Sequence, residues 1–520
     1  MRYGAKKKNG KCRTPKRAIT AIFPFQFALC MKKSKLIALL QTFSDKEIKR
    51  FVEFAQSPWF NKSKNLCRFC ELLAKAYPHF EESSIEKAHL YAQVFGVGKP
   101  YHDATLRNLV SDAMSLANRF LVQLNLELAP IEAHLYLARE LVMRDTLNLA
   151  EKELQDIDRQ LCQLNHSQGF YYQWRVLYYR LTDYLYYKQQ KIDLRNQTLQ
   201  QKLNNIFCNF WLDLFNLYSV LVNLNKTTTA YPFQLNEARA ALKLFNPVQY
   251  EQQPQIIVAY YMACLSDKTA GWDVFLDLHN ALKRHRRQLG SDIVIRANVF
   301  MANYLVHSAH AGSSETKQIL LDLYLDNVAL HEQRKENIPA WLFDVITDMS
   351  FGLKGEHWVQ QFINRYESHL LPDVRAGWLM YARARLYFYQ ANYPDAIALL
   401  ANNQPFHEQH YFYTRPLMLY AYFATANYDA FIALLDTLKH TLTRRKNELA
   451  PPKYTALKNS LAILPKLYKL RQHYTPALFN TLHTQLHNPQ TPFHYKTWLQ
   501  QQLAAMKQQP KTMPAIKLRK

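Results

Sequence analysis

A stretch of fourteen residues nearly repeats itself 35 positions further along the chain. Residues 387–400 read YFYQANYPDAIALL and residues 422–435 read YFATANYDAFIALL, with nine identities. A period in the thirties that holds two helix-length segments around a tight turn is typical of stacked helical hairpins. Because one hairpin cannot bury its apolar face alone, each needs a neighbour, and the repeat predicts an array of hairpins.

The composition also favours helices over sheets. Only 11 of the 520 residues are glycine, which weakens helix interiors and which sheet proteins use in their turns. The chain holds 33 tyrosines and 29 phenylalanines, whose bulky rings suit the space between layers of helices. We therefore expect an all-α protein in which a solenoid of helical hairpins follows a small helical N-terminal domain.

The chain is expected to divide into four parts. These are a basic extension at 1–30, a helical domain at 31–126, a hairpin solenoid at 129–505 with its clearest repeats at 374–440, and a basic tail at 506–520. Helices of about 13–20 residues with short turns should fill the solenoid. Three interpretations of the extension at 1–30 remain: a disordered basic arm, a mis-called translation start, or a targeting segment. The sequence does not decide between them.

One helix start is marked with particular clarity, at residues 43–48. Ser44 can cap the amide of Glu47 while the Glu47 side chain reaches back, and Phe43 can pack on Ile48. This pattern predicts a helix that begins just after Ser44.

The repeated segment resembles a known family. The matching positions are Ala384, Tyr387, Ala391, Tyr393 and Ala396 in the first unit and Tyr422, Ala426 and Tyr428 in the second. Over residues 378–440 this spacing of small and aromatic residues is similar to that of tetratricopeptide repeats. The resemblance implies a superhelix whose concave surface binds peptides or protein segments.

The N-terminal domain has a second resemblance, at residues 85–121. The motifs that carry it are Leu90, Phe95, Gly96 and Leu106–Leu116. They are similar to the winged-helix module attached to tetratricopeptide arrays in some bacterial transcription regulators, which implies that residues 104–120 would enter a DNA groove. Only Arg107 and Arg119 are basic there, whereas neutralising a DNA backbone takes several cations.

The net charge of +24 is unevenly distributed. Residues 1–30 carry eight unopposed positive charges and residues 507–520 five, which leaves +11 for the remainder. A positive net charge favours acidic proteins, nucleic acids or anionic membranes as partners, and it gives no information about the fold.

Seven scattered cysteines, an odd number, argue against a disulfide framework and for a reducing compartment. We therefore expect a cytoplasmic protein. No run reaches the roughly 18 apolar residues that a spanning helix requires, so no membrane span is expected. The sequence gives no prediction of the oligomeric state.

No motif points to catalysis, a metal or a cofactor. Cys67 and Cys70 form a CxxC without a second pair at zinc-ligand spacing, and we expect them to fill core space. His407 and His410 lack the HExxH spacing and are expected to be solvated. The chain is predicted not to be an enzyme.

Aromatic residues crowd one further segment, residues 171–187. They are Tyr171, Tyr172, Trp174, Tyr178, Tyr179, Tyr184, Tyr186 and Tyr187. Because they wrap most of a helix, packing between layers is favoured over a platform on which nucleic-acid bases stack.

These observations predict a non-enzymatic scaffold that binds a peptide or protein segment in the concave groove of the array. The partner-binding candidates are Arg383, Arg385, Arg415 and Tyr420. Because arginine pairs bidentately with carboxylates, an acidic or C-terminal peptide would suit this groove. The alternative, with nucleic acid as the less favoured partner, is a transcription regulator whose N-terminal module reads DNA while the array senses a partner.

Overall fold

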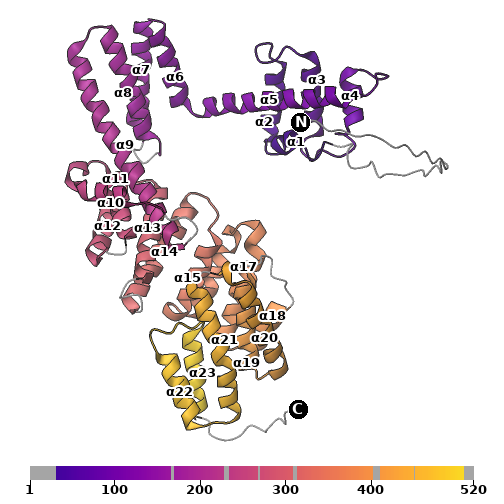
Figure 1. Cartoon of the computed structure of the whole chain (residues 1–520), viewed down its shortest axis with the longest axis vertical. Helices are drawn as coiled ribbons and strands as arrows, with labels where there is room; N and C mark the ends of the chain where they lie inside the picture. The colour runs from indigo at the N-terminus through magenta and orange to yellow at the C-terminus, as the bar shows by residue number, and fades with distance from the viewer. Residues whose placement is uncertain are drawn as a thin grey trace, which may run out of the picture. The chain divides into compact units, whose positions relative to one another are not determined.

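The computed structural model confirms the expectation of an all-α protein (Figure 1). It describes residues 31–164, 169–227, 233–267, 270–307, 313–401, 410–449 and 451–508. In this part of the chain it contains 23 α-helices and no strands. Two compact units divide between Asp158 and Arg159. The expected extension at 1–30 and the tail beyond residue 508 lie outside the described residues, while residues 506–508 form the end of the last helix.

The first unit is built around one long helix, α5. Its helices are α1 (Lys35–Leu40), α2 (Asp45–Gln56), α3 (Lys64–Ala76), α4 (Lys87–Phe95), α5 (Asp103–Leu128), α6 (Pro130–Met143) and α7 (Leu147–Gln163), the last of which crosses the boundary between the units. Phe51, Phe69 and Phe120 are buried in the core between α1 and α5. Helix α2 begins where the sequence predicted, with both hydrogen bonds of the Ser44–Glu47 capping box present.

The second unit contains the remaining helices. They are α8 (Tyr171–Lys188), α9 (Ile192–Thr227), α10 (Asn236–Leu244), α11 (Pro254–Ser266), α12 (Trp272–His285), α13 (Ser291–His307), α14 (Ser314–Gln333), α15 (Ala340–Leu353), α16 (Glu356–Tyr366), α17 (Pro372–Tyr389), α18 (Tyr393–Ala401), α19 (Tyr411–Ala424), α20 (Tyr428–Arg444), α21 (Pro451–Gln472), α22 (Pro476–His487) and α23 (Lys496–Gln508).

Helices in this unit pack mainly on their neighbours in the sequence. Each of α11 to α22 contacts the next helix along the chain, and α11, α15, α17 and α21 also contact the next but one. The buried apolar residues form two clusters, one from residue 171 to 382 and one from residue 380 to 503. This serial order of pairwise contacts is consistent with a helical array.

The same tight turn recurs between consecutive helices. At its centre lies a residue with a left-handed φ between 55° and 57°: Asp145, Gln190, Lys335, Ala391 and Ala426. In each case this residue donates its N–H to the carbonyl three positions earlier, and the next residue donates to the carbonyl five positions earlier. These two hydrogen bonds satisfy carbonyls at the end of the preceding helix. The two nearly repeated sequence segments therefore share one turn geometry.

Helix α9 differs from the expected helices of about 13–20 residues. It spans 36 residues, from Ile192 to Thr227. Because residues 192–227 contain neither proline nor glycine, nothing in this segment interrupts the backbone hydrogen bonds.

Candidate functional site

The four residues expected to line a groove lie on α17 and α19, and they differ in exposure. Arg383 is exposed and pairs with Glu367, with an Nη2 to Oε2 distance of 2.6 Å. Arg415 is half-buried beside Met418. Arg385 and Tyr420 are only 2% and 0% exposed. A partner can therefore reach Arg383 and Arg415, whereas Arg385 and Tyr420 belong to the interior.

Arg385 on α17 holds two neighbouring hairpins together. Its Nη2 lies 2.9 Å from Asp344 Oδ1 and its Nη1 3.0 Å from Asp348 Oδ1, both on α15. It also donates to the Thr347 hydroxyl, and its guanidinium lies 4.7 Å from the centre of the Tyr381 ring. Burial raises the pKa of the Asp344 carboxyl, and the Arg385 charge opposes this effect. A buried charge needs such partners, so the cluster has a packing role.

Tyr420 also has an interior role. Its hydroxyl lies 3.1 Å from His494 Nδ1 and donates to the His494 carbonyl at 3.3 Å. The His494 N–H donates to Ser460 Oγ at 2.9 Å. Burial lowers the pKa of His494 to about 3, so the imidazole is neutral at pH 7. These bonds fasten the segment before α23 to α19 and α21.

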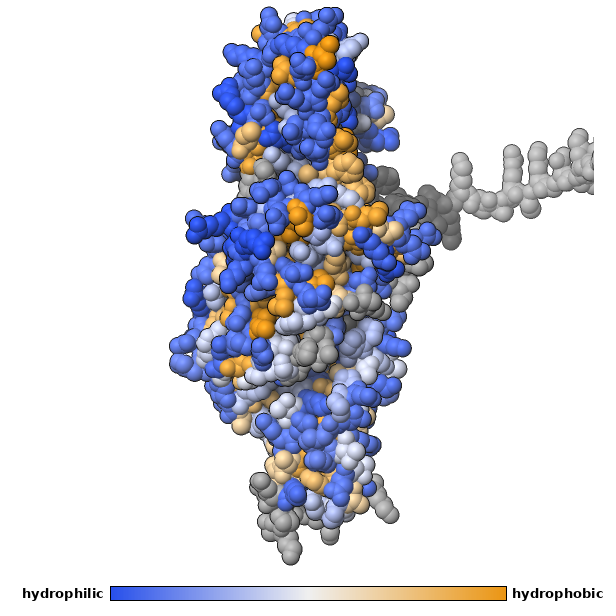
Figure 2. Space-filling model, turned by 90° about the vertical axis from the view of Figure 1, so that its left-hand side faces the viewer, coloured by the Kyte–Doolittle hydropathy of each residue, from blue (hydrophilic) through white to orange (hydrophobic). Residues whose placement is uncertain are grey.

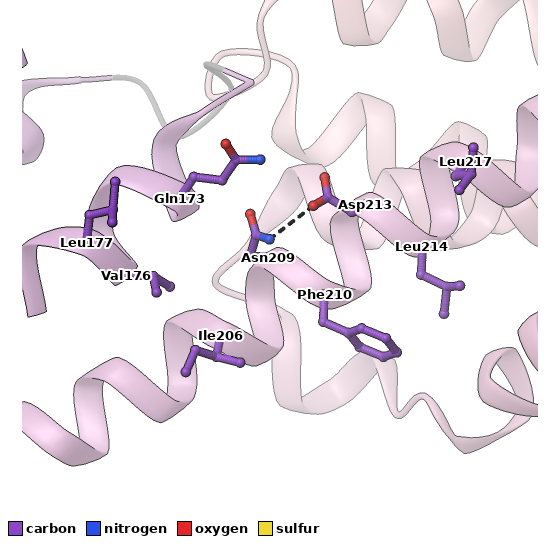
Figure 3. A pocket seen from close by; sticks show the side chains of 9 residues that line it. All are labelled: Gln173, Val176, Leu177, Ile206, Asn209, Phe210, Asp213, Leu214 and Leu217. Carbon is purple, nitrogen blue, oxygen red and sulfur yellow. Dashed lines mark hydrogen bonds between the residues drawn. The ribbon is translucent and has the colours of Figure 1, made fainter. Parts of the chain in front are cut away.

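A different part of the second unit has an open apolar groove, which lies between α8 and α9 (Figure 3). Its volume is about 640 Å³, and its lining consists of Gln173, Val176, Leu177, Ile206, Asn209, Phe210, Asp213, Leu214 and Leu217. The side chains from α8 form one wall and those from α9 the other. Asn209 donates to Asp213 at 3.0 Å, so the polar contribution from α9 is itself hydrogen-bonded.

The groove belongs to a longer exposed stripe along α9, which we call the α9 stripe. Its apolar members, between 39% and 69% exposed, are Ile192, Leu199, Leu203, Ile206, Phe210, Leu217, Val220 and Leu224. Together with Asn196 and Asp213 they follow each other at alternating steps of three and four residues. This is the 3.5-residue period of a helix that packs lengthwise against another helix.

The opposite face of α9 is covered by protein. Cys208, Phe215, Tyr218 and Val222 are buried there, and α9 packs on α8 and α11. The helix therefore has two apolar faces. One is part of the core of the unit, and the other is open to solvent.

Helix α8 has a matching exposed stripe, which we call the α8 stripe. Its members are Phe170, Gln173, Leu177, Arg180, Tyr184 and Tyr187, again three and four residues apart. The sequence predicted that the aromatic residues of this segment pack between layers. Tyr171 and Tyr172 are buried as expected, but Tyr184 and Tyr187 are 40% and 56% exposed.

Both stripes follow a heptad pattern that is visible in the sequence. The period alone does not say whether such a face is buried inside the unit or open. In the space-filling view, apolar surface is open to solvent among polar side chains in the upper part of the picture, the part in which Figure 1 labels α8 and α9 (Figure 2).

Within the described residues, α9 is the one helix that by length and composition alone could cross a membrane. About a third of its most apolar window is buried. Long core helices of proteins pass the same test, and α9 carries the polar residues Asn209, Asp213 and Asn216.

The helix that would enter DNA in the winged-helix resemblance is α5. Arg107 Nε lies 3.0 Å from Asp103, and Arg119 donates to the Phe60 carbonyl at 3.0 Å. Both cations are thus engaged within the first unit.

Cys70 of the CxxC motif and His410 of the histidine pair are both buried. Burial raises the pKa of Cys70 to about 12, and the Cys67 thiol donates to the Ala55 carbonyl at 3.2 Å. His410 is buried against Trp378 and Tyr413, so the prediction that it is solvated is wrong, while His407 lies outside the described residues. In the described part of the chain, no group of three or more histidine, cysteine or acidic residues could hold a metal ion.

The fold and the groove define this chain as an all-helical protein of serially packed helices with an open apolar face. No protein-family model, curated protein or solved structure matches it.

Proposed function

We propose that the chain is a non-enzymatic protein-interaction scaffold built as a tetratricopeptide-like solenoid. Two observations support the solenoid: the serial contacts of α11 to α23 and the recurrent left-handed turn. The turns at Ala391 and Ala426 lie within the sequence segments that resemble the family. Such arrays typically serve as extended binding surfaces.

The observation that carries the proposed function is the α9 stripe with the adjoining groove. Eight apolar side chains at heptad spacing on one face of α9 are 39–69% exposed. Scattered exposed apolar residues are normal, but a contiguous patch of this kind is typical of a docking surface.

The period of the stripe indicates the chemistry of the ligand. A groove between two helices, with ridges spaced 3.5 residues apart, accepts a third helix lying along it. The ligand is therefore a protein helix with apolar residues at i, i+3, i+4 and i+7. The binding surface that we propose is therefore the α8–α9 face, with Arg383 as an additional contact for acidic segments.

Site-specific photo-crosslinking tests this proposal. A benzophenone side chain at position 206 or 217, in the groove, should form crosslinks to a polypeptide in living cells. The same probe at position 244, where Leu244 is 79% exposed outside the stripes, should not. Equal crosslinking from all three positions, or none from 206 and 217, would contradict the proposal.

The proposed cellular compartment is the cytoplasm. Cys67, Cys70, Cys162, Cys208 and Cys264 are all free thiols, as a reducing compartment requires.

A further inference from the structure

We infer that the ligand of the α8–α9 face is the same face of a second copy of the chain, so that the two α9 helices pack antiparallel along their stripes and each α8 flanks one half of the pair. This inference rests on the proposed function, because it identifies the helix that the docking surface receives. Three features of the face support it: its two parallel stripes, its charges and its size.

The first feature is that both helices of the hairpin contribute a stripe. A single bound helix would need one groove with apolar walls. Here α8 and α9 each present residues at steps of three and four along most of their length, from Phe170 to Tyr187 and from Ile192 to Leu224. Helix α8 runs beside only the first half of the longer α9. A second hairpin lying antiparallel packs its α9 along this α9, and its α8 flanks the half that the first α8 does not reach.

The second feature is a pair of opposite charges within the stripes, Arg180 on α8 and Asp213 on α9, both exposed. Asp183 contacts Arg195 at 2.9 Å and Lys202 at 3.3 Å. Since α8 and α9 run in opposite directions, Arg180, one turn before Asp183, lies level with the turn of α9 around Lys202.

A two-fold axis perpendicular to the helices makes these charges complementary. The α9 stripe runs from Ile192 to Leu224, so its middle lies close to residue 208. Lys202 and Asp213 lie about equally far on either side of that middle. Rotation about the axis therefore brings Arg180 of each copy level with Asp213 of the other. A parallel arrangement would leave the two charges about 16 Å apart along the bundle. Polar residues at such positions fix register and orientation.

The third feature is size. The 18 residues of α8 extend about 27 Å, and two adjacent helices are about 20 Å wide. This face covers on the order of 500 Å² per copy, and the extra length of the 36-residue α9 brings it towards the roughly 800 Å² per partner of a standard interface. A second copy therefore has enough surface for a specific dimer.

Analytical ultracentrifugation of the full chain at micromolar concentration tests the inference. We expect a dimer for the wild-type chain and a monomer for the L203E/L217E double variant, since both leucines lie in the α9 stripe. The matched control is L244E/V248E, which changes two residues that are 79% and 73% exposed elsewhere and should remain a dimer. Circular dichroism verifies that all chains keep their helix content, as expected for exposed positions.

A charge exchange provides a test that misfolding cannot imitate. Arg180→Asp and Asp213→Arg should each weaken the dimer at least tenfold, because each places like charges across the axis. The double variant R180D/D213R should restore wild-type affinity. Single variants as tight as wild type, or a double variant as weak as the singles, would overturn the antiparallel pairing.

Failure of this inference can be told apart from failure of the proposed function. A monomeric wild-type chain whose positions 206 and 217 crosslink to a different polypeptide overturns the dimer and leaves the scaffold proposal standing. A monomer that instead floats with lipid vesicles, and loses this in L203E/L217E, overturns both and makes the stripe a membrane contact. A dimer that persists in L203E/L217E overturns the inference as well.

Discussion

At the scale of single residues, Ala391 and Ala426 have small side chains and an unfavourable backbone conformation. Both have a φ near 56°, in the left-handed region. An L-residue other than glycine costs about 1–2 kcal/mol there. Each turn is held by two backbone hydrogen bonds, such as Asn392 N–H to the Tyr387 carbonyl at 2.8 Å, which offset this cost.

Ala391→Gly should therefore stabilise the protein by about 1 kcal/mol, because glycine adopts this conformation without strain. Ala426→Gly should behave alike. The matched control is Ala433→Gly, in the exposed middle of α20, which should destabilise by about 1 kcal/mol. Urea unfolding measures all three, and a loss of stability in A391G would contradict the strain argument.

His494 predicts a dependence of stability on pH. Its ordinary pKa is about 6.5, and burial lowers the folded-state pKa to about 3. Between these two values the unfolded chain binds a proton that the folded chain does not. Stability should thus fall as the pH drops from about 6.5 to about 3, by about 1.4 kcal/mol per pH unit from this residue.

His494→Gln should reduce that slope while lowering stability at pH 7, because the contact with Tyr420 changes. Unfolding free energies measured from pH 7 to pH 4 for both chains provide the comparison. Parallel curves for the variant and the wild type would show that His494 does not carry the effect.

At the scale of helices, the Arg385 cluster shows how one hairpin is fixed on the next. The guanidinium on α17 is shared between Asp344 and Asp348 on α15. Removing one partner of a buried ion pair lowers the free energy of unfolding strongly, because the remaining buried charge has no opposite charge beside it.

Arg385→Met should accordingly destabilise the second unit by about 3–5 kcal/mol. Adding Asp344→Asn, which removes the more buried of the two carboxylates left without Arg385, should recover part of this loss. Urea unfolding of the two single variants and the double variant gives the coupling energy. Strictly additive effects would mean that the two side chains do not depend on each other.

The Arg385 cluster also shows which features of the structure could be predicted from the sequence and which could not. The repeat around Ala391 and Ala426 correctly predicted helices and a shared turn, because local hydrogen bonds determine both. Whether Arg385 faces solvent depends on α15, some 40 positions away in the sequence, and no local pattern contains that information. For α9, the heptad period was present in the sequence, but its exposure follows from which helices cover the other face.

At the scale of the molecule, the chain consists of two units with separate cores. The first unit buries Phe51 and its neighbours between residues 31 and 124, and the second buries two clusters from residue 171 to 503. Units with their own cores generally unfold independently.

Calorimetry should therefore resolve two transitions. Phe51→Ala, at a fully buried position, should lower only the transition of the first unit, because a cavity of this kind costs about 3–5 kcal/mol locally. Phe423→Ala should lower only the transition of the second unit. If either variant shifted both transitions equally, the units would be thermodynamically coupled.

The recurrent turn has a consequence for how such a chain evolves. Aspartate, glutamine, lysine and alanine all occupy its central position, because main-chain atoms rather than a particular side chain close it. A pair of helices joined by such a turn is a structural unit that can stack on any neighbour with a matching apolar face. We expect that insertion or loss of whole helix pairs changes the length of the array. No new turn sequence is needed, provided that the helix pairs on either side still pack their apolar faces together.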